Sequence, residues 1–336
     1  MANTSGVRYK RNQNKKNRDS KKQSPAAPKM LPETLSISGS KYIGRYSFVC
    51  GNSVPIYEVD TVHGLNQLIG YAKFNNQSYG NVYYRGECKL HDSLKPSLYR
   101  KGKKAEGVSS RLNIVIKRFL EDPHMIRELK LDKQDVDNQR YKIEGMLQHY
   151  GIPTRFIDVV DNHWIALWMG LYKAKKFKQR NEYFHYIQRS VPVVDIVRGA
   201  KSPDDDLFQY VLLMAVPFSK KRSFSGIQTS EDYIEVDLRQ ALPSIFLRPH
   251  AQHGLVLKRK VHGHDVGRSA NDYDMASTVI GIIKVRIDNV REWIGNGALL
   301  TQENLFPPPG YDYGYDLLLT RADLFEGSEY SIVRYV

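Results

Sequence analysis

QHYGIPTRFID, residues 148–158, joins the end of a helix to an extended segment. Gly151 suits the C-terminus of a helix, and Pro153 prevents the helix from continuing. We therefore expect residues 152–160 to be extended. A helix end, a forced break and a run of polar residues place several donors and acceptors at one corner of the fold, and binding sites often form at such corners.

Amphipathic helices are expected on both sides of this stretch. Residues 112–120 carry apolar side chains at intervals of three and four, which is the pattern of a helix with one buried face. The four expected helices run from Asp60 or Thr61 to about Phe74, from Ser109 or Ser110 through Leu120, from about Asp135 to Gly151, and from Asp161 or Asn162 to Leu171.

Apolar or alternating runs dominate the second half of the chain. Expected strands occupy residues 56–59, 81–84, 210–216, 233–237, 254–259 and 278–287. Helices early and strands late indicate an α+β fold. The chain has 336 residues, of which 41% are hydrophobic, so residues 31–336 can form a single domain with a sizeable core.

Tyr84-Arg85-Gly86 follows the expected strand 81–84, so Arg85 is expected where a strand stops and the chain reverses. A guanidinium at a buried strand end is costly unless it meets an anion. Because side chains alternate along a strand, Tyr83 and Arg85 share one face. An aromatic ring beside a cation suits a ligand that carries both a phosphate and a ring.

Residues 1–30 contain nine Lys or Arg residues and one acid, Asp19, so this segment carries +8 of the total net charge of +14. Almost nothing in it is apolar, and we expect a disordered basic tail. Such tails contact nucleic acid through its phosphates, and the alternative is a solubilising extension.

Several common classes of protein are not indicated by the sequence. It contains no P-loop, GxGxxG or HExxH motif, and its two cysteines, Cys50 and Cys88, form no CxxC pair, so no metal site is expected. No secretory signal and no apolar run of membrane-spanning length occur. We expect a protein of a reducing cytoplasm without a membrane partner.

A second polar corner, LRPHAQHG at residues 247–254, leads into the expected strand 254–259. It again places polar side chains, Gln252 and His253 among them, beside a glycine.

These motifs together resemble the FRG domain family. The resemblance rests on Tyr84-Arg85-Gly86, on KPSLYR at residues 95–100, on QHYGIPTRFID, on Ala166-Leu167-Trp168, on AQHG at residues 251–254 and on Leu305-Phe306-Pro307. It spans about residues 60–310, and QHYG-x-PTR is its most specific part.

The order of these motifs is similar to that of ADP-ribosyltransferases, which implies a split β-sheet core with flanking helices and NAD as substrate. By that resemblance Arg85, between Tyr84 and Gly86, holds the pyrophosphate of NAD. Residues 154–158 take the place of the second, polar strand, and Gln252 takes the place of the late glutamate. The catalytic set is then Arg85, Asp158 and Gln252.

The resemblance also implies a set of residues that bind NAD. Tyr84 or Tyr150 stacks on a ring, while His149 and Thr154 contact the ribose or the nicotinamide amide. Arg155 and His253 complete the set.

The chain departs from the arginine-specific transferases at two points. No Ser-Thr-Ser stands at residues 154–156, and no Glu-x-Glu precedes Leu255. A carboxylate is needed beside the cation-like ribose of the transition state. Asp158 or Glu87 must supply it, or the site is inactive.

Each of these residues also has a purely structural interpretation. Arg85 can be a sheet-edge arginine paired to an acid, and Asp158 can be a local turn acceptor. His149 and Tyr150 can end a helix and pack, while Gln252 and His253 can be satisfied polar residues.

The sequence therefore supports two hypotheses. The first is an NAD-dependent ADP-ribosyltransferase-like effector of the toxin or phage-defence type, restrained by an inhibitory antitoxin-like partner. RNA is its favoured acceptor because of the basic tail, and protein is the alternative acceptor. The second is a non-catalytic nucleic-acid or nucleotide-binding module that uses the same pocket as a sensor.

Overall fold

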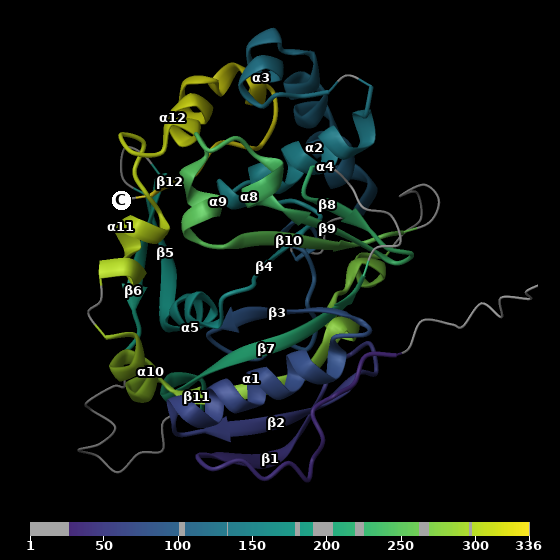
Figure 1. Cartoon of the computed structure of the whole chain (residues 1–336). Helices are drawn as coiled ribbons and strands as arrows, with labels where there is room; N and C mark the ends of the chain where they lie inside the picture. The colour runs from purple at the N-terminus through teal and green to yellow at the C-terminus, as the bar shows by residue number, and fades with distance from the viewer. Residues whose placement is uncertain are drawn as a thin grey trace, which may run out of the picture.

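The computed structural model describes residues 27–100, 105–132, 134–178, 182–190, 204–218, 225–261, 269–295 and 298–335. Within these ranges the fold is α+β, with one large mixed sheet, one small sheet and helices packed against both (Figure 1).

The large sheet has nine strands in the order β1-β2-β11-β7-β3-β4-β10-β9-β8. Neighbouring strands are antiparallel except β11 and β2, which are parallel. The strands are β1 (Ser40–Ser47), β2 (Ser53–Val59), β3 (Gly80–Glu87), β4 (Ile157–Val160), β7 (Phe208–Pro217), β8 (Ile227–Thr229), β9 (Tyr233–Asp237), β10 (Gly254–Arg259) and β11 (Val279–Arg286).

A three-stranded sheet stands beside the large one. It consists of β5 (Tyr172–Lys178), β6 (Glu182–Gln188) and β12 (Arg334–Tyr335), in the order β12-β6-β5. β5 continues directly from α5 (His163–Leu171), so the small sheet starts at the end of a helix that packs on β3.

The helices divide between the two halves of the large sheet. α1 (Val62–Asn76) packs against β2, β3 and β7, whereas α2 (Ala105–Glu121), α3 (Pro123–Glu128), α4 (Val136–His149) and α12 (Tyr313–Thr320) gather beyond β10 (Figure 1). The remaining helices are short: α7 (Asp204–Leu207), α8 (Leu238–Ala241), α9 (Leu247–Ala251), α10 (Ile287–Ile294) and α11 (Gln302–Leu305).

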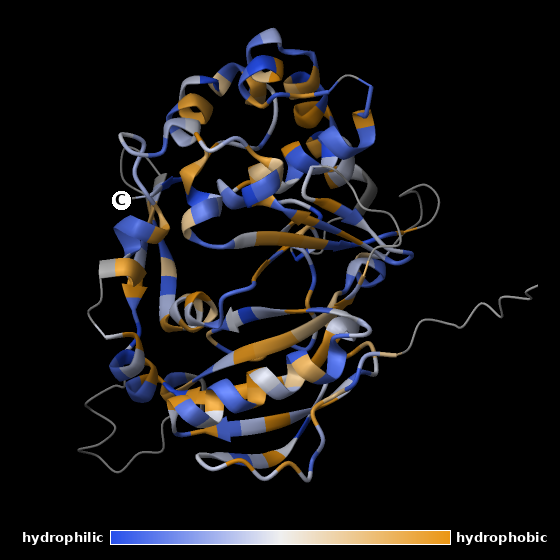
Figure 2. Ribbon diagram, viewed as in Figure 1, coloured by the Kyte–Doolittle hydropathy of each residue, from blue (hydrophilic) through white to orange (hydrophobic). Residues whose placement is uncertain are grey.

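Three clusters of buried side chains form the core, and Figure 2 shows the hydrophobic residues running along β7, β10 and the inner helices. One cluster packs α1 and α5 on the face of β3 that carries Tyr84. A second lies on the opposite face, which carries Tyr83. The third joins α2, α4 and α12 to β9 and β10. The alternation expected along β3 is confirmed for residues 82–84 by this division.

The large sheet is joined weakly in its middle. β3 pairs with β7 at eight positions, from Gly80 opposite Pro217 to Glu87 opposite Tyr210. It pairs with β4 at one position, Tyr84 opposite Val160. Cavities are lined by residues of β3 on either side of this position, and they are described below.

Helix starts agree with the sequence expectations where a capping side chain is present. Thr61 caps α1, Asp135 caps α4 and Asn162 caps α5, each by accepting a hydrogen bond from a backbone amide of the first turn. α2 begins at Ala105, several residues before the expected Ser109 or Ser110. Residues 233–237 and 254–259 are strands with the expected bounds.

Two local expectations were wrong. β3 does not stop at Tyr84 but continues through Arg85 to Glu87, because β7 offers partners along that whole length. Residues 152–160 are not extended throughout, since the chain bends at Arg155 and only residues 157–160 form a strand, paired with β10.

Of the expected basic tail, residues 1–26 lie outside the described residues, and Lys29 is anchored to α1. The backbone of Lys29 exchanges hydrogen bonds with the side chain of Asn76, at 2.8 Å and 2.9 Å. Leu31 is 2% exposed and packs into the core beside Gly281. The folded domain therefore begins slightly before residue 31, at about Lys29.

No helix within the described ranges has the length and apolar character needed to cross a membrane. Cys50 and Cys88 are both free thiols.

Candidate functional site

Six of the residues expected at the site line one cavity of about 260 Å³ between β3, β4 and the small sheet. We call it the aromatic cavity, because five aromatic side chains form much of its wall: Tyr84, Tyr172, Tyr186, Phe306 and Tyr335. Its polar lining comprises Arg85, Gln148, His149, Asp158 and Gln252, and its other lining residues are Gly86, Val159, Val160, Met169 and Ala174.

A second cavity of about 370 Å³ adjoins Arg85. We call it the Arg100 cavity. It is lined by Arg85, Glu87, His91, Asp92, Ser93, Leu94, Lys95, Arg100 and Ile157. Arg85 is the side chain that both cavities share.

Two acceptors hold the guanidinium of Arg85 in place. Its Nε donates to Glu87 Oε1 at 2.6 Å, and its Nη1 donates to the backbone oxygen of Asp158 at 2.7 Å. Its Nη2 has no hydrogen-bond partner among the described residues. Burial lowers the pKa of Arg85, but the negative charges of Glu87 and Asp158 outweigh it and raise the pKa above its ordinary value. The guanidinium is thus a fixed cation with one nitrogen available to a ligand.

Gly86 allows α5 to pack directly on β3. A Cβ at this position would overlap the backbone oxygen of Ala166 and lie 2.9 Å from the backbone nitrogen of Gly170. The glycine of the YRG motif therefore sets the distance between β3 and α5, and with it the width of the aromatic cavity.

A relay of hydrogen bonds fixes the carboxylate of Asp158. Thr154 Oγ1 donates to Gln148 Oε1 at 2.6 Å, and Gln148 Nε2 donates to Asp158 Oδ2 at 2.8 Å. The amide of Phe156 in turn donates to Thr154 Oγ1 at 3.1 Å. The turn between α4 and β4 thus orients Asp158 through a buried threonine and a glutamine.

His149 lies beside the same carboxylate. Its Nε2 is 3.6 Å from Asp158 Oδ1, and neither ring nitrogen has a hydrogen-bond partner in the described part of the chain. Burial lowers the pKa of His149, although Asp158 acts in the opposite direction. The ring is therefore neutral near pH 7 and can accept or donate one hydrogen bond.

Gly254 makes room for this imidazole. A Cβ at Gly254 would collide with the His149 ring and lie 2.8 Å from its Nε2. Because Gly254 begins β10, the glycine of the AQHG motif lets the end of α4 approach the sheet.

Gln252 occupies the other side of the cavity. It is 4% exposed and ends α9, and its Nε2 donates to the backbone oxygen of Leu305 at 2.6 Å. Its Oε1 has no partner among the described residues, so this oxygen can accept a hydrogen bond from a ligand hydroxyl.

Four residues expected to bind NAD do not line the aromatic cavity. Thr154 acts on it only through Gln148. Arg155 pairs with buried Glu144 at 2.6 Å and 2.8 Å, which anchors the turn to α4. His253 has its Nδ1 3.0 Å from Asp161 Oδ1.

The fourth residue, Tyr150, is completely buried. Its hydroxyl donates to Asp312 Oδ2 at 2.7 Å, and the guanidinium carbon of Arg248 lies 4.6 Å from its ring centroid. The side chain of Tyr150 packs in the core at the C-terminus of α4, whereas that of His149 lines the cavity. The Tyr150 ring therefore does not reach a ligand bound in the aromatic cavity.

The sequence did not single out several residues of the two cavities. Four of them lie within motifs of the FRG resemblance: Lys95, Arg100, Gln148 and Phe306. Their place in these motifs is the signal by which the sequence could have identified them. Tyr172, Tyr186 and Tyr335 come from the small sheet, for which no pattern in the sequence predicted an element.

Comparison with known proteins gives a family for this region. No curated protein and no solved structure matches the chain. Residues 80–179 match the family model of the FRG domain, from the first residue of β3 to just beyond β5. The matched segment contains Arg85, Gln148, His149 and Asp158, and the chain therefore carries an FRG domain.

Proposed function

We propose that the FRG domain of this protein is an NAD-dependent ADP-ribosyltransferase-like enzyme whose two cavities hold the nicotinamide riboside and the pyrophosphate of one NAD molecule. The observation that carries this proposal is the position of Arg85, which lines both the aromatic cavity and the Arg100 cavity. A dinucleotide needs this arrangement, with a cation between a site for a ring and a site for phosphate.

The Arg100 cavity suits the pyrophosphate. Arg85, Lys95 and Arg100 all line it, and charge-assisted hydrogen bonds from such side chains are the usual way to bind phosphate. Burial and the like charge of Arg85 lower the pKa of Arg100. Desolvation and mutual repulsion make it unfavourable to hold two cations this close together. An anionic ligand between Arg85 and Arg100 would offset both effects.

The aromatic cavity suits the nicotinamide ring. Its volume of about 260 Å³ is smaller than the range of about 300–1,000 Å³ that is common for complete ligands. One ring with its ribose would fit, and the rest of the dinucleotide would pass Arg85 into the Arg100 cavity. Tyr84, Tyr172 and Phe306 offer faces on which a ring can stack.

Asp158 is then the carboxylate of the reaction. In the proposed transfer the bond between C1′ of the ribose and the nicotinamide nitrogen breaks, and its electron pair leaves with nicotinamide. The acceptor oxygen or nitrogen forms a new bond to C1′ and loses its proton to Asp158 or to water. A negative charge beside the cation-like ribose should be worth about 3–4 kcal/mol, by analogy with the loss of one donor from an oxyanion hole.

Gln252 and His149 would position the ribose. Gln252 Oε1 and the neutral imidazole of His149 face the same cavity as Asp158 and can each accept a hydrogen bond from a ribose hydroxyl. Glu87, the other carboxylate considered, pairs with Arg85 and lines the Arg100 cavity instead.

RNA is the favoured acceptor in this proposal, because residues 1–30 carry nine basic residues that can contact phosphates. Protein is the second choice of acceptor. An enzyme that consumes NAD in its own cytoplasm would be harmful, which supports a toxin or antiviral-defence role under the control of an inhibitory partner protein.

One experiment tests the enzyme and its acceptor together. The full-length protein is incubated with adenine-labelled NAD and, separately, with total RNA, DNA and lysate protein, and both label transfer and nicotinamide release are measured. We expect Arg85→Ala to reduce both rates by about 10²–10³. The control is Arg45→Ala, which removes an arginine on β1 that pairs with Glu33 away from both cavities.

A non-catalytic sensor is the second candidate, and one observation favours it. The cation at the centre of the site is already paired within the protein, through Glu87 and the backbone of Asp158. NAD binding that depends on Arg85 but releases no nicotinamide would establish the sensor and refute the enzyme.

A further inference from the structure

A third cavity, larger than the two at Arg85, lies beside the first half of β3, residues 80–83. Its volume is about 470 Å³, and we call it the Glu235 cavity. Its lining joins α1, β3, β8, β9 and α8, and it shares no residue with the aromatic cavity or the Arg100 cavity. Its polar lining residues are Lys73, Gln77, Asn81, Tyr83, Asp161, Gln228, Glu235, Asp237, Arg239 and Gln240.

Glu235 has no cationic partner among the described residues, although it is only 5% exposed. Its Oε1 accepts a hydrogen bond from the hydroxyl of Tyr83 at 2.5 Å, and its Oε2 accepts none within the described chain. Burial raises the pKa of Glu235, and the negative charge of Asp237 adds to the rise. A buried carboxyl without a cation beside it favours its neutral form, and a bound cation would stabilise its charged form.

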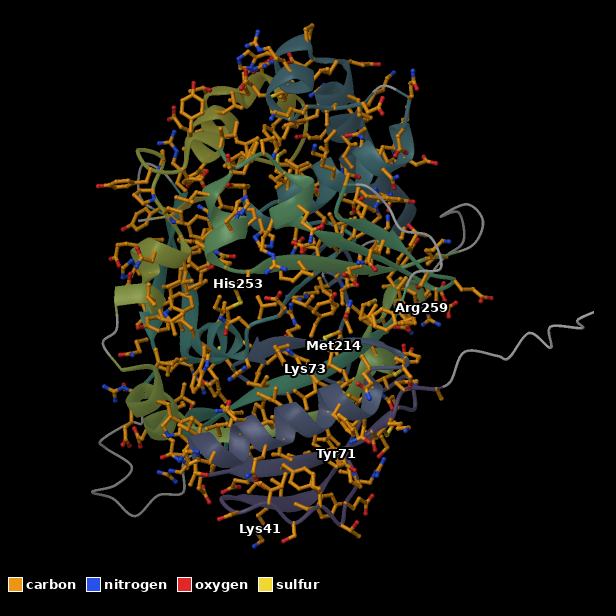
Figure 3. All side chains as sticks on the ribbon, viewed as in Figure 1. Lys41, Tyr71, Lys73, Met214, His253 and Arg259 are labelled. Atoms are coloured by element: carbon orange, nitrogen blue, oxygen red, sulfur yellow. The ribbon has the colours of Figure 1, made fainter. Side chains whose placement is uncertain are left out.

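The other buried charges of the cavity are already compensated. Arg239 pairs with Asp237 at 2.8 Å and with Asp161 at 2.9 Å. Lys73 is exposed, with its Nζ 5.3 Å from the Tyr84 ring centroid, and Figure 3 shows it on α1 below β3. Glu235 is therefore the one deeply buried acidic group that the described lining leaves without a cationic partner.

The surroundings of Glu235 match the hydrogen-bonding pattern of an organic cation. Asn81 Nδ2 donates to the Tyr83 hydroxyl at 2.9 Å, and the side-chain oxygen of Asn81 has no partner in the described ranges. Phe218, which is 49% exposed, also lines the cavity and offers a ring face. A carboxylate, a carboxamide oxygen and an aromatic ring together favour a guanidinium or ammonium group.

We propose that the Glu235 cavity binds a cationic side chain, of the arginine or lysine type, with Glu235 as its counterion. This site is separate from the proposed NAD site and stands whether or not NAD is a substrate. A metal ion is a poorer match, because the described residues contain no cluster of three His, Cys, Asp or Glu side chains that could hold one.

The cationic group could come from two sources. One is the chain itself, which carries eight Lys and Arg residues between Arg8 and Lys22. The other is a separate protein or peptide. Both would present the same chemistry to Glu235.

The test is calorimetric titration of the full-length protein with three amide-capped amino acids: arginine, lysine and citrulline. Citrulline has nearly the shape of arginine but no charge. We expect arginine and lysine to bind in the millimolar range or tighter, and citrulline to bind at least about tenfold more weakly. Equal binding of arginine and citrulline would overturn the proposal. So would the absence of cation binding both in the full-length protein and in the variant, described below, that lacks the basic residues between Arg8 and Lys22.

Two variants assign the effect to Glu235. Glu235→Gln keeps an oxygen for the Tyr83 hydroxyl and should weaken arginine binding about 10- to 100-fold, with the thermal midpoint measured as a check of folding. Glu58→Gln removes a carboxylate of β2 that lies near Lys284, outside the cavity, and should change nothing. Unchanged binding by folded Glu235→Gln would refute the site.

A third variant separates the two sources of the cation. In it, the eight basic residues between Arg8 and Lys22 are replaced by Gln in the full-length chain. Tighter binding of the arginine probe would identify the protein's own basic segment as the natural occupant of the Glu235 cavity. Unchanged affinity would exclude this segment as the occupant of the cavity.

Discussion

At the scale of single residues, the polar residues of QHYGIPTRFID divide between those that line the site and those that support it. Gln148 and Thr154 orient Asp158, and Arg155 ties the turn to Glu144. Only Gln148, His149 and Asp158 of this stretch reach the aromatic cavity. The motif therefore encodes a rigid turn that presents one carboxylate and one imidazole.

The pair of Arg155 and Glu144 should be visible in the pH dependence of stability. Burial raises the pKa of Glu144, but Arg155 and Lys258 outweigh it and lower the pKa from 4.5 to about 2. A carboxyl whose pKa is lower in the folded state stabilises the fold above its unfolded pKa and ceases to do so as the pH falls. We expect the free energy of unfolding, measured in urea, to fall between about pH 4.5 and pH 2.

Glu144→Gln should flatten this part of the pH profile. Arg155→Ala should cost about 3–5 kcal/mol at pH 7, because it leaves Glu144 buried without its main partner. A cost below 1 kcal/mol for Arg155→Ala would contradict a structural role for this pair.

The relay through Thr154 predicts a second residue-scale effect. Thr154→Val leaves Gln148 Oε1 without its closest donor, and we expect a loss of about 1–3 kcal/mol of stability. Thr154→Ser retains the hydroxyl and should cost less. If the two variants unfold at the same denaturant concentration, the hydrogen bond to Gln148 does not stabilise the turn.

At the scale of elements, Gly254 allows α4 to approach the sheet and Gly86 allows α5 to approach it. Gly254→Ala would push the His149 ring out of its place, so we expect it to lower the thermal midpoint and to weaken ligand binding in the aromatic cavity. The matched control is Gly70→Ala on the exposed side of α1, where a Cβ meets nothing within 4 Å. That control should stabilise the protein by about 0.5–1 kcal/mol.

Elements with strong local signals could be predicted from the sequence, and those that depend on distant partners could not. Three helices begin at residues whose side chains commonly cap a helix: Thr61, Asp135 and Asn162. β9 and β10 have clear apolar runs. β12 has two residues and exists only because it pairs with β6. β5 reads YKAKKFK, which is too basic to suggest a core strand.

The contrast between local sequence signals and dependence on distant partners also explains which site residues could be predicted. Arg85, His149 and Asp158 lie in local motifs with an unusual grouping of polar residues beside glycines. Tyr172, Tyr186 and Tyr335 reach the aromatic cavity only through the pairing of the small sheet. Tyr150 and His149 are neighbours in sequence, and only the packing of α4 shows which of them faces the cavity.

At the scale of the whole molecule, the charge is concentrated at one end of the sequence. If residues 1–30 contact RNA phosphates, the logarithm of the binding constant should fall steeply with the logarithm of the salt concentration. Replacing the nine basic residues of this segment by Gln should reduce the slope by about 0.7 for each lost phosphate contact. An unchanged slope, measured by fluorescence anisotropy, would exclude this segment from RNA binding.

The central claim is that one NAD molecule spans both cavities at Arg85. The most direct test is a crystal structure of the protein with a non-cleavable carbocyclic analogue of NAD. We predict the pyrophosphate within hydrogen-bond distance of Arg85 and Arg100, the nicotinamide ring against the tyrosines of the aromatic cavity, and Asp158 beside the nicotinamide ribose. A nucleotide bound away from Arg85, or a ring that lies outside the aromatic cavity, would contradict the claim.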